Sequence, residues 1–221
     1  MAKRPQFMIH ACIPREWYVR DYLIPSMIEQ GIKEEDIEVW LDRNNDGCLF
    51  SAMKAFHECG KRDGGTWHMQ DDVVISSDFA EKTREHDDGV VCGYMYRGFE
   101  LMEPRPGRVP AVFSWNSFPC IRIPNNLAGE FADWFFTDAI YRDNYKEWVE
   151  SNKHDDSFWH DFYDECHNDD HAFNLKPSIV DHIDYMLGGS VVNQWRGYRT
   201  RATFWEDEKV VEELQIKLAR R

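Results

Sequence analysis

Several features that would assign a chain to a familiar class are missing from this sequence. No apolar run approaches the ~20 residues that a helix needs to span a bilayer, and the apolar stretch at residues 7–13 is too short and interrupted for a signal-peptide core. The six cysteines do not show the C-x-x-C spacing that zinc and redox sites use. We therefore expect a cytoplasmic protein in a reducing compartment, with no membrane span.

Basic residues are also few: Lys and Arg number 26 against 40 Asp and Glu, which gives a net charge of −14. An acidic surface repels phosphate backbones and anionic lipids, so broad affinity for nucleic acids or membranes is not expected. The exception is a late group of arginines that either lines a local basic groove or simply faces water. The group comprises Arg196, Arg199, Arg201, Arg220 and Arg221.

Internal repeats and low-complexity linkers are absent too, so we expect a single domain, residues 1–221. Apolar residues make up 43% of the chain and aromatic residues 14%, enough for burial to offset the entropy lost on ordering. Tryptophans in the second half suit either a core or stacking against a sugar ring or a base. They are Trp115, Trp134, Trp148 and Trp159.

Strands and helices alternate over the first half. The apolar pattern predicts strands at residues 6–12, 37–41, 66–69 and 90–95 and helices at 17–30 and 49–58, with Gly31 ending the first helix. This alternation is typical of an α/β fold with a Rossmann-like, mainly parallel sheet and flanking helices. The second half predicts an extended segment at 111–123, a short strand at 172–175, and helices at 128–136, 145–150, 156–166 and 206–218.

Polar residues follow each of the first three predicted strands, where ligands gather in such sheets. Pro14 and Arg15 follow the first strand, Asp42 the second, and Asp71 with Asp72 the third. Two adjacent carboxylates repel each other unless a cation neutralises them, and a hard divalent ion would also bridge substrate phosphates. The alternative is a solvated pair at a strand end. The apolar residues on both sides of the pair favour the metal.

Asp42 has two interpretations on spacing alone. Its carboxylate suits hydrogen bonds from a nucleotide base or ribose, or it forms the turn that follows the strand. Residues 42–47 also match the first half of a calcium loop, but Met53 stands where a bidentate Glu is required and no helix is expected before the loop. We therefore do not expect an EF-hand.

Two further groups are candidates for chemistry. Asp155 and Asp156 precede a predicted helix, where they would either cap it or act as a general base toward an acceptor hydroxyl. His182 follows a short strand and would be either a third ligand to a metal or phosphate, or a structural histidine.

In order and spacing these residues resemble the GT-A glycosyltransferases, particularly small bacterial and phage-type members with a Pro-Ser-Leu-Val-Asp-His-Ile-like segment, here residues 177–183. The resemblance extends from about residue 9 to residue 182. Gln70 stands at the first Asp of the family's D-x-D metal motif. The four matching pieces are Pro14-Arg15 with Tyr18, Asp42 with Gly47, residues 67–73 around Asp71 and Asp72, and Asp155-Asp156 ahead of Pro177-Ser178.

The resemblance implies that residues 1–95 bind a nucleotide-sugar, residues 96–204 form the acceptor side and residues 205–221 a terminal helix. It implies Mn²⁺ or Mg²⁺ held by Asp72, with His182 completing the site, and a catalytic base at Asp156 or Asp155. The other implied contacts are to the donor: Pro14, Arg15 and Tyr18 at the start of the nucleotide pocket, Asp42 at the nucleoside and Asp71 at the sugar or ribose.

The function implied is a metal-dependent, hexosyltransferase-like glycosyltransferase that moves a sugar from a UDP-sugar to a hydroxyl. The acceptor would be a glycan, a small molecule or a modified DNA base, and the last would suit the late arginines. Inversion of the sugar would need the base; retention would not. One alternative is a non-catalytic module that binds nucleotide or glycan on the same fold. The other is a nucleotidyltransferase, although no Gly-rich phosphate loop near the amino terminus supports it.

Overall fold

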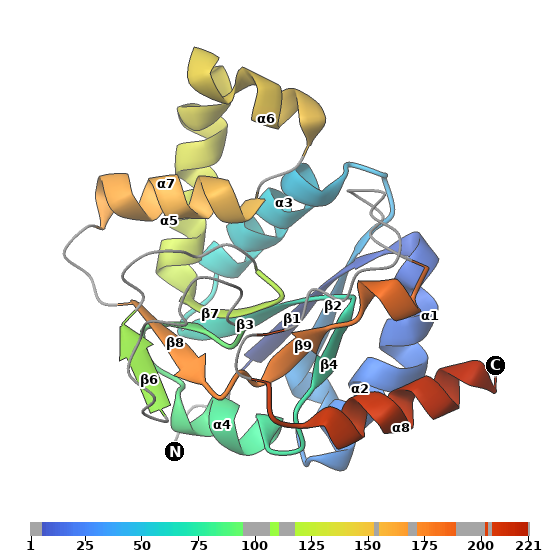
Figure 1. Ribbon diagram of the computed structural model, residues 1–221. Coiled ribbons are helices and arrows are strands. Elements are labelled where there is room, and N and C mark those ends of the chain that lie inside the picture. The colour runs from blue at the N-terminus through green and yellow to red at the C-terminus, as the bar shows by residue number, and fades with distance from the viewer. Residues whose placement is uncertain are drawn as a thin grey trace.

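The computed structural model describes residues 6–94, 107–110, 118–152, 155–167, 172–188, 202 and 205–220. These residues form an α/β structure in which a central sheet is flanked by helices (Figure 1). Several sequence features lie outside the described residues: the extended segment at 111–117, Trp115, and the arginines at 196, 199, 201 and 221.

The central sheet, within the described part of the chain, has seven strands in the order β2-β1-β3-β7-β5-β8-β6. Strand β1 pairs in parallel with both β2 and β3, and β5 pairs in parallel with β8. The other two strands, β7 and β6, run against their neighbours. The strands are β1 Gln6–Cys12, β2 Ile37–Asp42, β3 Gly65–Gln70, β5 Val90–Cys92, β6 Gly107–Pro110, β7 Cys120–Pro124 and β8 Ala172–Lys176.

The expected α/β sheet is thus confirmed, and five of the seven strands share one direction. The sheet is mixed, because the antiparallel strand β7 separates β3 from β5. The strand predicted at residues 90–95 is present as β5, Val90–Cys92, but nothing in the sequence pattern indicated an antiparallel strand between it and β3.

Helices cover both faces of the sheet (Figure 1). Alternate side chains of β1 mark the two faces: Phe7 packs on Phe79 of α4, whereas His10 packs on Phe56 of α3. The helices are α3 Cys48–Gly60, α4 Phe79–Glu85, α5 Asn125–Thr137, α6 Lys146–Ser151, α7 Asp155–Cys166 and α8 Glu208–Ala219.

The predicted helix at residues 17–30 is a run of three short helical segments: α1 Glu16–Tyr18, the π-helical turn η2 Val19–Leu23 and α2 Ile24–Glu29. A single 3-10 turn, η1 Ile13–Arg15, precedes them. The π turn comes just before Pro25, which has no N–H to continue the regular ladder. The helix ends at Gly31, whose φ of +85° suits a residue without a Cβ.

A second, two-stranded sheet joins distant parts of the chain. Strand β4 (Val73–Ile75) pairs antiparallel with β9 (Val180–His182), and Val73 lies opposite His182. Helix α8 lies beside this ribbon (Figure 1). Because β4 begins directly after Asp72, the ribbon connects the end of β3 with the segment that carries His182.

Trp134, Trp148 and Trp159 belong to a core between α5, α6 and α7. Trp159 is fully buried against Phe131, and the half-buried Trp134 packs on the same ring. Trp148 is half-buried against Phe158. For these three tryptophans the structure supports the core interpretation over sugar stacking.

Among the described residues, no helix has both the length and the apolar character needed to cross a membrane. All six cysteines are free thiols.

Candidate functional site

Charged side chains meet at the carboxyl ends of β1 and β3. Arg15 comes from η1, just beyond β1, and Asp71 and Asp72 directly follow β3. Nη1 of Arg15 donates to Oδ1 of Asp71 at 3.0 Å and makes a shorter contact with Oδ2 of Asp72. The backbone N–H of Cys12 donates to Oδ2 of Asp71 at 2.7 Å. All three charged residues are buried, each with only 6% of its surface exposed.

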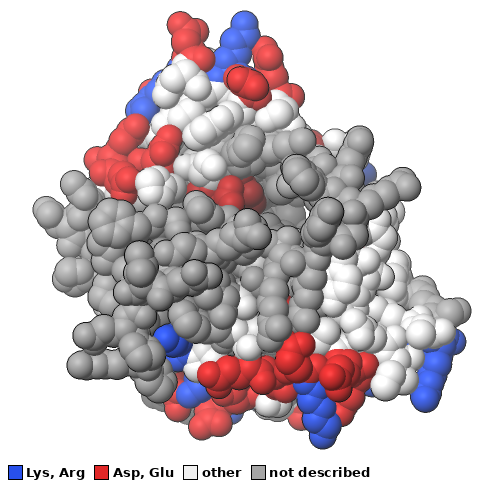
Figure 2. Space-filling model, viewed as in Figure 1, with Lys and Arg blue, Asp and Glu red and all other residues white. Residues whose placement is uncertain are grey.

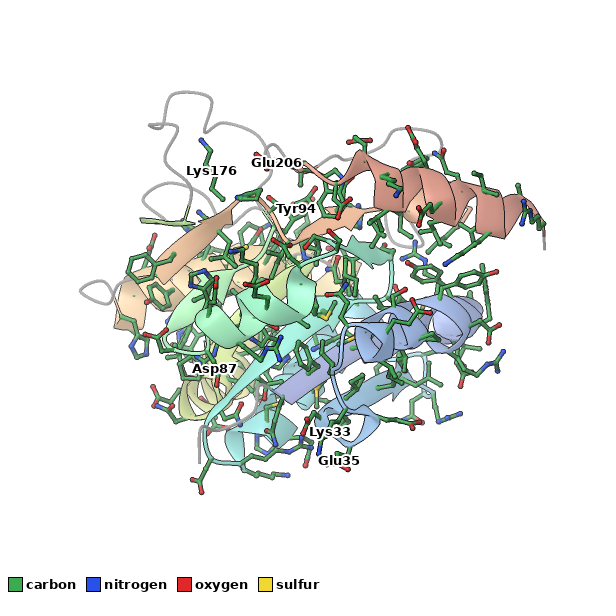
Figure 3. All side chains as sticks on the ribbon, turned by 90° about the horizontal axis from the view of Figure 1, so that it is seen from below. Lys33, Glu35, Asp87, Tyr94, Lys176 and Glu206 are labelled. Atoms are coloured by element: carbon green, nitrogen blue, oxygen red, sulfur yellow. The ribbon has the colours of Figure 1, made fainter. Side chains whose placement is uncertain are left out.

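His182 reaches the same site through the β4–β9 ribbon. Its Nε2 lies 3.1 Å from Oδ1 of Asp72, and its Nδ1 lies 3.7 Å from Oδ1 of Asp184. The ring of Tyr94, a buried residue labelled in Figure 3, meets the His182 ring edge-on. Sequence reasoning found His182 but missed Tyr94 and Asp184.

The charges shift one another's pKa values. Burial and the charge of Asp72 raise the pKa of Asp71. Burial also opposes ionisation of Asp72, but attraction to His182 and Arg15 outweighs it and lowers the pKa of Asp72. Burial would lower the pKa of His182, yet Asp72 raises it instead. Asp72 is therefore the carboxylate that stays ionised most firmly.

Asp72 and His182 are two side chains that could contact a divalent cation at this edge of the sheet. The buried Oδ1 of Asp72 pairs with Nε2 of His182 and accepts no well-aligned hydrogen bond within the described residues, so a cation bound there would share Asp72 with His182. Neighbouring ligands of an octahedral ion, bound at about 2.1 Å and at right angles, lie about 3.0 Å apart. The 3.1 Å between Oδ1 of Asp72 and Nε2 of His182 matches that spacing.

The metal site is incomplete without a further ligand. No group of three or more His, Cys, Asp or Glu side chains with the geometry for a metal occurs in the described ranges. Mg²⁺ is often bound by only one or two protein side chains, while water and substrate phosphates fill its remaining coordination positions. Asp72 and His182 are therefore candidates for a metal that arrives with an anionic substrate.

Asp42 lies at the same edge of the sheet, opposite Cys12 in the β1–β2 register. Its two carboxylate oxygens accept the backbone N–H groups of Asp46, at 2.8 Å, and Gly47, at 2.9 Å. This is the turn-forming alternative. Since Asp42 belongs to strand β2 rather than to a loop after a helix, the structure also excludes the EF-hand.

Pro14 and Tyr18 occupy different environments. Pro14 is exposed beside the site. Tyr18 is 2% exposed, and its hydroxyl donates to the carbonyl of Val73 at 2.8 Å. Tyr18 therefore holds β4 in place, and the area it offers to a nucleotide is small.

Asp155 and Asp156 stand at the start of α7, opposite the start of α3. Cys48 is the first residue of α3, and burial raises the pKa of its thiol. The negative charges of Asp155 and Asp156 on α7, and of Asp71 and Asp72 after β3, raise this pKa further. All four carboxylates therefore act on one thiol. Burial and the charge of Asp156 raise the pKa of Asp155 to about 7, whereas Asp156 accepts the N–H of Ser157 at 2.8 Å.

Asn152, three residues before α7, binds the start of α3 and the loop that precedes it. Its Oδ1 accepts the N–H groups of Leu49 and Phe50 at 3.1 and 3.2 Å, and its Nδ2 donates to the carbonyl of Asp46. Gly47 is required at this contact, because its φ is +88° and a Cβ there would lie 1.9 Å from Nδ2 of Asn152. Sequence reasoning missed Asn152, since its partners are about a hundred residues away.

Asn152→Gly is expected to lower the free energy of unfolding by about 1–2 kcal/mol, because α3 loses an N-terminal cap. Glycine tolerates the left-handed conformation of Asn152, whose φ is +53°, so the loss reports mainly the side chain. Urea denaturation measures the change. Ser151→Ala, which removes an exposed hydroxyl bonded to the Trp148 carbonyl, should change stability much less; an equal loss for both variants would contradict the capping role.

A groove of about 450 Å³ lies elsewhere, between α2 and α8. Tyr18, Tyr22 and Leu214 line it, but Asp71, Asp72 and His182 do not. We therefore locate the candidate site by its converging charges.

Acidic side chains also gather on the surface between α4 and the start of α8 (Figure 2). This negative charge disfavours binding of phosphate backbones to this face.

Comparison with known proteins leaves the family open. The chain matches no protein-family model, and a search of curated protein sequences finds no match either.

Proposed function

We propose that this protein is a metal-dependent glycosyltransferase of the GT-A type that uses a nucleotide-sugar, most simply a UDP-sugar. One observation carries the proposal: the buried Arg15, Asp71 and Asp72 and the half-buried His182 come from three separate segments and meet at the carboxyl edge of the sheet. Burying charged groups costs folding free energy, so such clusters are found mainly where a ligand or a reaction requires them. The edge is also where α/β sheets bind nucleotides.

The metal, Mn²⁺ or Mg²⁺, would be held by Asp72 and His182. When bound, it supplies positive charge that stabilises the nucleoside diphosphate leaving group. Arg15 lies beside the same carboxylate and contributes a second positive charge for the phosphates. Asp71, fixed by the Cys12 N–H, offers its oxygens to sugar or ribose hydroxyls.

Asp155 is the better candidate for the base. A general base works best when its pKa is near the working pH, and the pKa of Asp155 is about 7. Asp156 is engaged with the Ser157 N–H at the start of α7. In this assignment Asp155 accepts the proton of the acceptor hydroxyl, and Asp156 adjusts the acidity of Asp155 by its charge.

The rate of sugar transfer should therefore rise with pH and reach half of its maximum near pH 7, because only deprotonated Asp155 accepts a proton. In Asp156→Asn the neighbouring negative charge is lost, so the pKa of Asp155 falls and the half-maximum moves to lower pH by about one unit. A pH profile of kcat for both proteins measures the shift. An unchanged midpoint in Asp156→Asn would contradict the assignment.

A thermal-shift and calorimetric screen of nucleotides and nucleotide-sugars, with and without Mn²⁺, tests the proposed function. A ligand at 100 times its Kd stabilises the folded state by about 2.7 kcal/mol, which is readily detected. We expect a UDP-sugar to stabilise the protein only when Mn²⁺ is present, followed by slow release of free sugar. Binding without release would favour a non-catalytic module, and no Mn²⁺-dependent binding of any nucleotide-sugar would refute the proposal.

A further inference from the structure

Arg15 occupies the position of a counter-ion in this site. One atom, Nη1, contacts a carboxylate oxygen of both Asp71 and Asp72. The guanidinium and the two carboxylates are buried together. The charge that a divalent cation would neutralise is thus already balanced in part by a residue of the chain.

We infer that Arg15 makes binding of the divalent cation conditional on a diphosphate: it competes with the cation for Asp72 until an anionic ligand draws the guanidinium away. The inference rests on the proposed function, because it assumes that Asp72 and His182 are the metal ligands. It gives Arg15 a second role beyond contact with the nucleotide-sugar: control of when the cation binds.

Electrostatics gives the direction of the effect. The cation would bind Oδ1 of Asp72, while Arg15 holds Oδ2 of the same carboxylate. A divalent cation and a guanidinium on the two oxygens of one carboxylate repel each other, which we expect to weaken the cation's affinity by roughly 10- to 100-fold. In the absence of phosphate, Arg15 is therefore a competitor.

A diphosphate reverses this relation. Guanidinium groups bind phosphate oxygens through paired, charge-assisted hydrogen bonds, so the ligand offers Arg15 a new partner and adds negative charge beside the cation. Coupling of this kind is reciprocal: the cation strengthens diphosphate binding by the same factor that the diphosphate strengthens cation binding. The site would then bind the cation and the diphosphate together and either one alone weakly.

Arg15→Gln tests the inference, with Mn²⁺ binding followed by the electron paramagnetic resonance signal of the free ion. The titrations use Mn²⁺ alone and Mn²⁺ with UDP, whose own complex with Mn²⁺ is measured separately. We expect Arg15→Gln to bind Mn²⁺ alone about 10- to 100-fold more tightly than the wild type. UDP should raise the Mn²⁺ affinity of the wild type far more than that of the variant.

Arg20→Gln is the matched control. Arg20 lies on η2, is exposed and pairs with Asp21, so the variant loses the same charge without affecting Asp71 or Asp72. It should bind Mn²⁺ as the wild type does. Arg15→Lys keeps the charge and should keep the dependence on UDP.

The outcomes separate the two proposals. Equal affinity of the wild type and Arg15→Gln for Mn²⁺ alone, or equal enhancement by UDP, overturns the inference about Arg15 and leaves the proposed function intact. Failure of the wild type to bind Mn²⁺ even with UDP overturns the proposed function itself. Should Arg15→Gln be unfolded by circular dichroism in metal-free buffer, Mn²⁺ should restore its fold, and failure to do so overturns the inference.

Discussion

Replacing Arg15 by glutamine is expected to lower the free energy of unfolding by about 3–5 kcal/mol in metal-free buffer. The variant leaves Asp71 and Asp72 adjacent and buried, without the guanidinium that contacts both. A buried carboxylate that loses its cation must either stay charged in a poor environment or take up a proton. Urea denaturation at pH 7 measures the loss.

Two companion variants show whether the loss arises from the carboxylates. Arg20→Gln removes an arginine that is 69% exposed in its pair with Asp21, and should cost less than about 1 kcal/mol. The double variant Arg15→Gln, Asp71→Asn should be less destabilised than the sum of the single variants, because only one buried carboxylate is then left without the guanidinium. Strict additivity would show that Arg15 acts through packing instead.

Asp72→Asn is expected to lower the rate of donor turnover by about 10²- to 10³-fold, the loss typical when a charge that stabilises a transition state is removed. Asparagine has the size of aspartate but not its charge, and Asp72 is the carboxylate that both Arg15 and His182 hold ionised. The variant should also lose the dependence on Mn²⁺. Hydrolysis of a UDP-sugar, which needs no acceptor, is the assay.

The matched control for this variant is Asp164→Asn on α7. Asp164 is exposed and pairs only loosely with His160, at 3.5 Å, so the net charge changes equally while the site does not. Its turnover should equal that of the wild type. A folded Asp72→Asn protein with full, Mn²⁺-dependent turnover would contradict both the metal site and the proposed mechanism.

Local sequence patterns predicted many of the elements closely. The first strand occupies residues 6–12, as expected, and the helix expected at 49–58 extends by only a few residues to Cys48–Gly60. Gly31 ends its helix as expected. These features depend on side-chain periodicity and on the conformations open to glycine, which are properties of neighbouring residues.

The long-range pairings could not be predicted in this way. Strand β7 enters the sheet between β3 and β5, and β9 pairs with β4 across more than a hundred residues. Such pairings depend on which surfaces remain uncovered after the helices pack, and periodicity within a segment carries no information about its partner. The tie between Asn152 and the start of α3 belongs to the same class.

By itself, the sequence determined that charged residues follow the strands of an α/β sheet, because strand ends and turns depend on the residue types within short segments. It also identified Arg15, Asp71, Asp72 and His182 as candidates, and only the resemblance to a known family implied that they act at one site. Only the tertiary structure decided that one arginine atom contacts both carboxylates, that His182 lies 3.1 Å from Asp72, and that Asp42 serves its own loop. The physical reason is that a side chain's partners, and therefore its charge state, are set by packing between segments far apart in the chain.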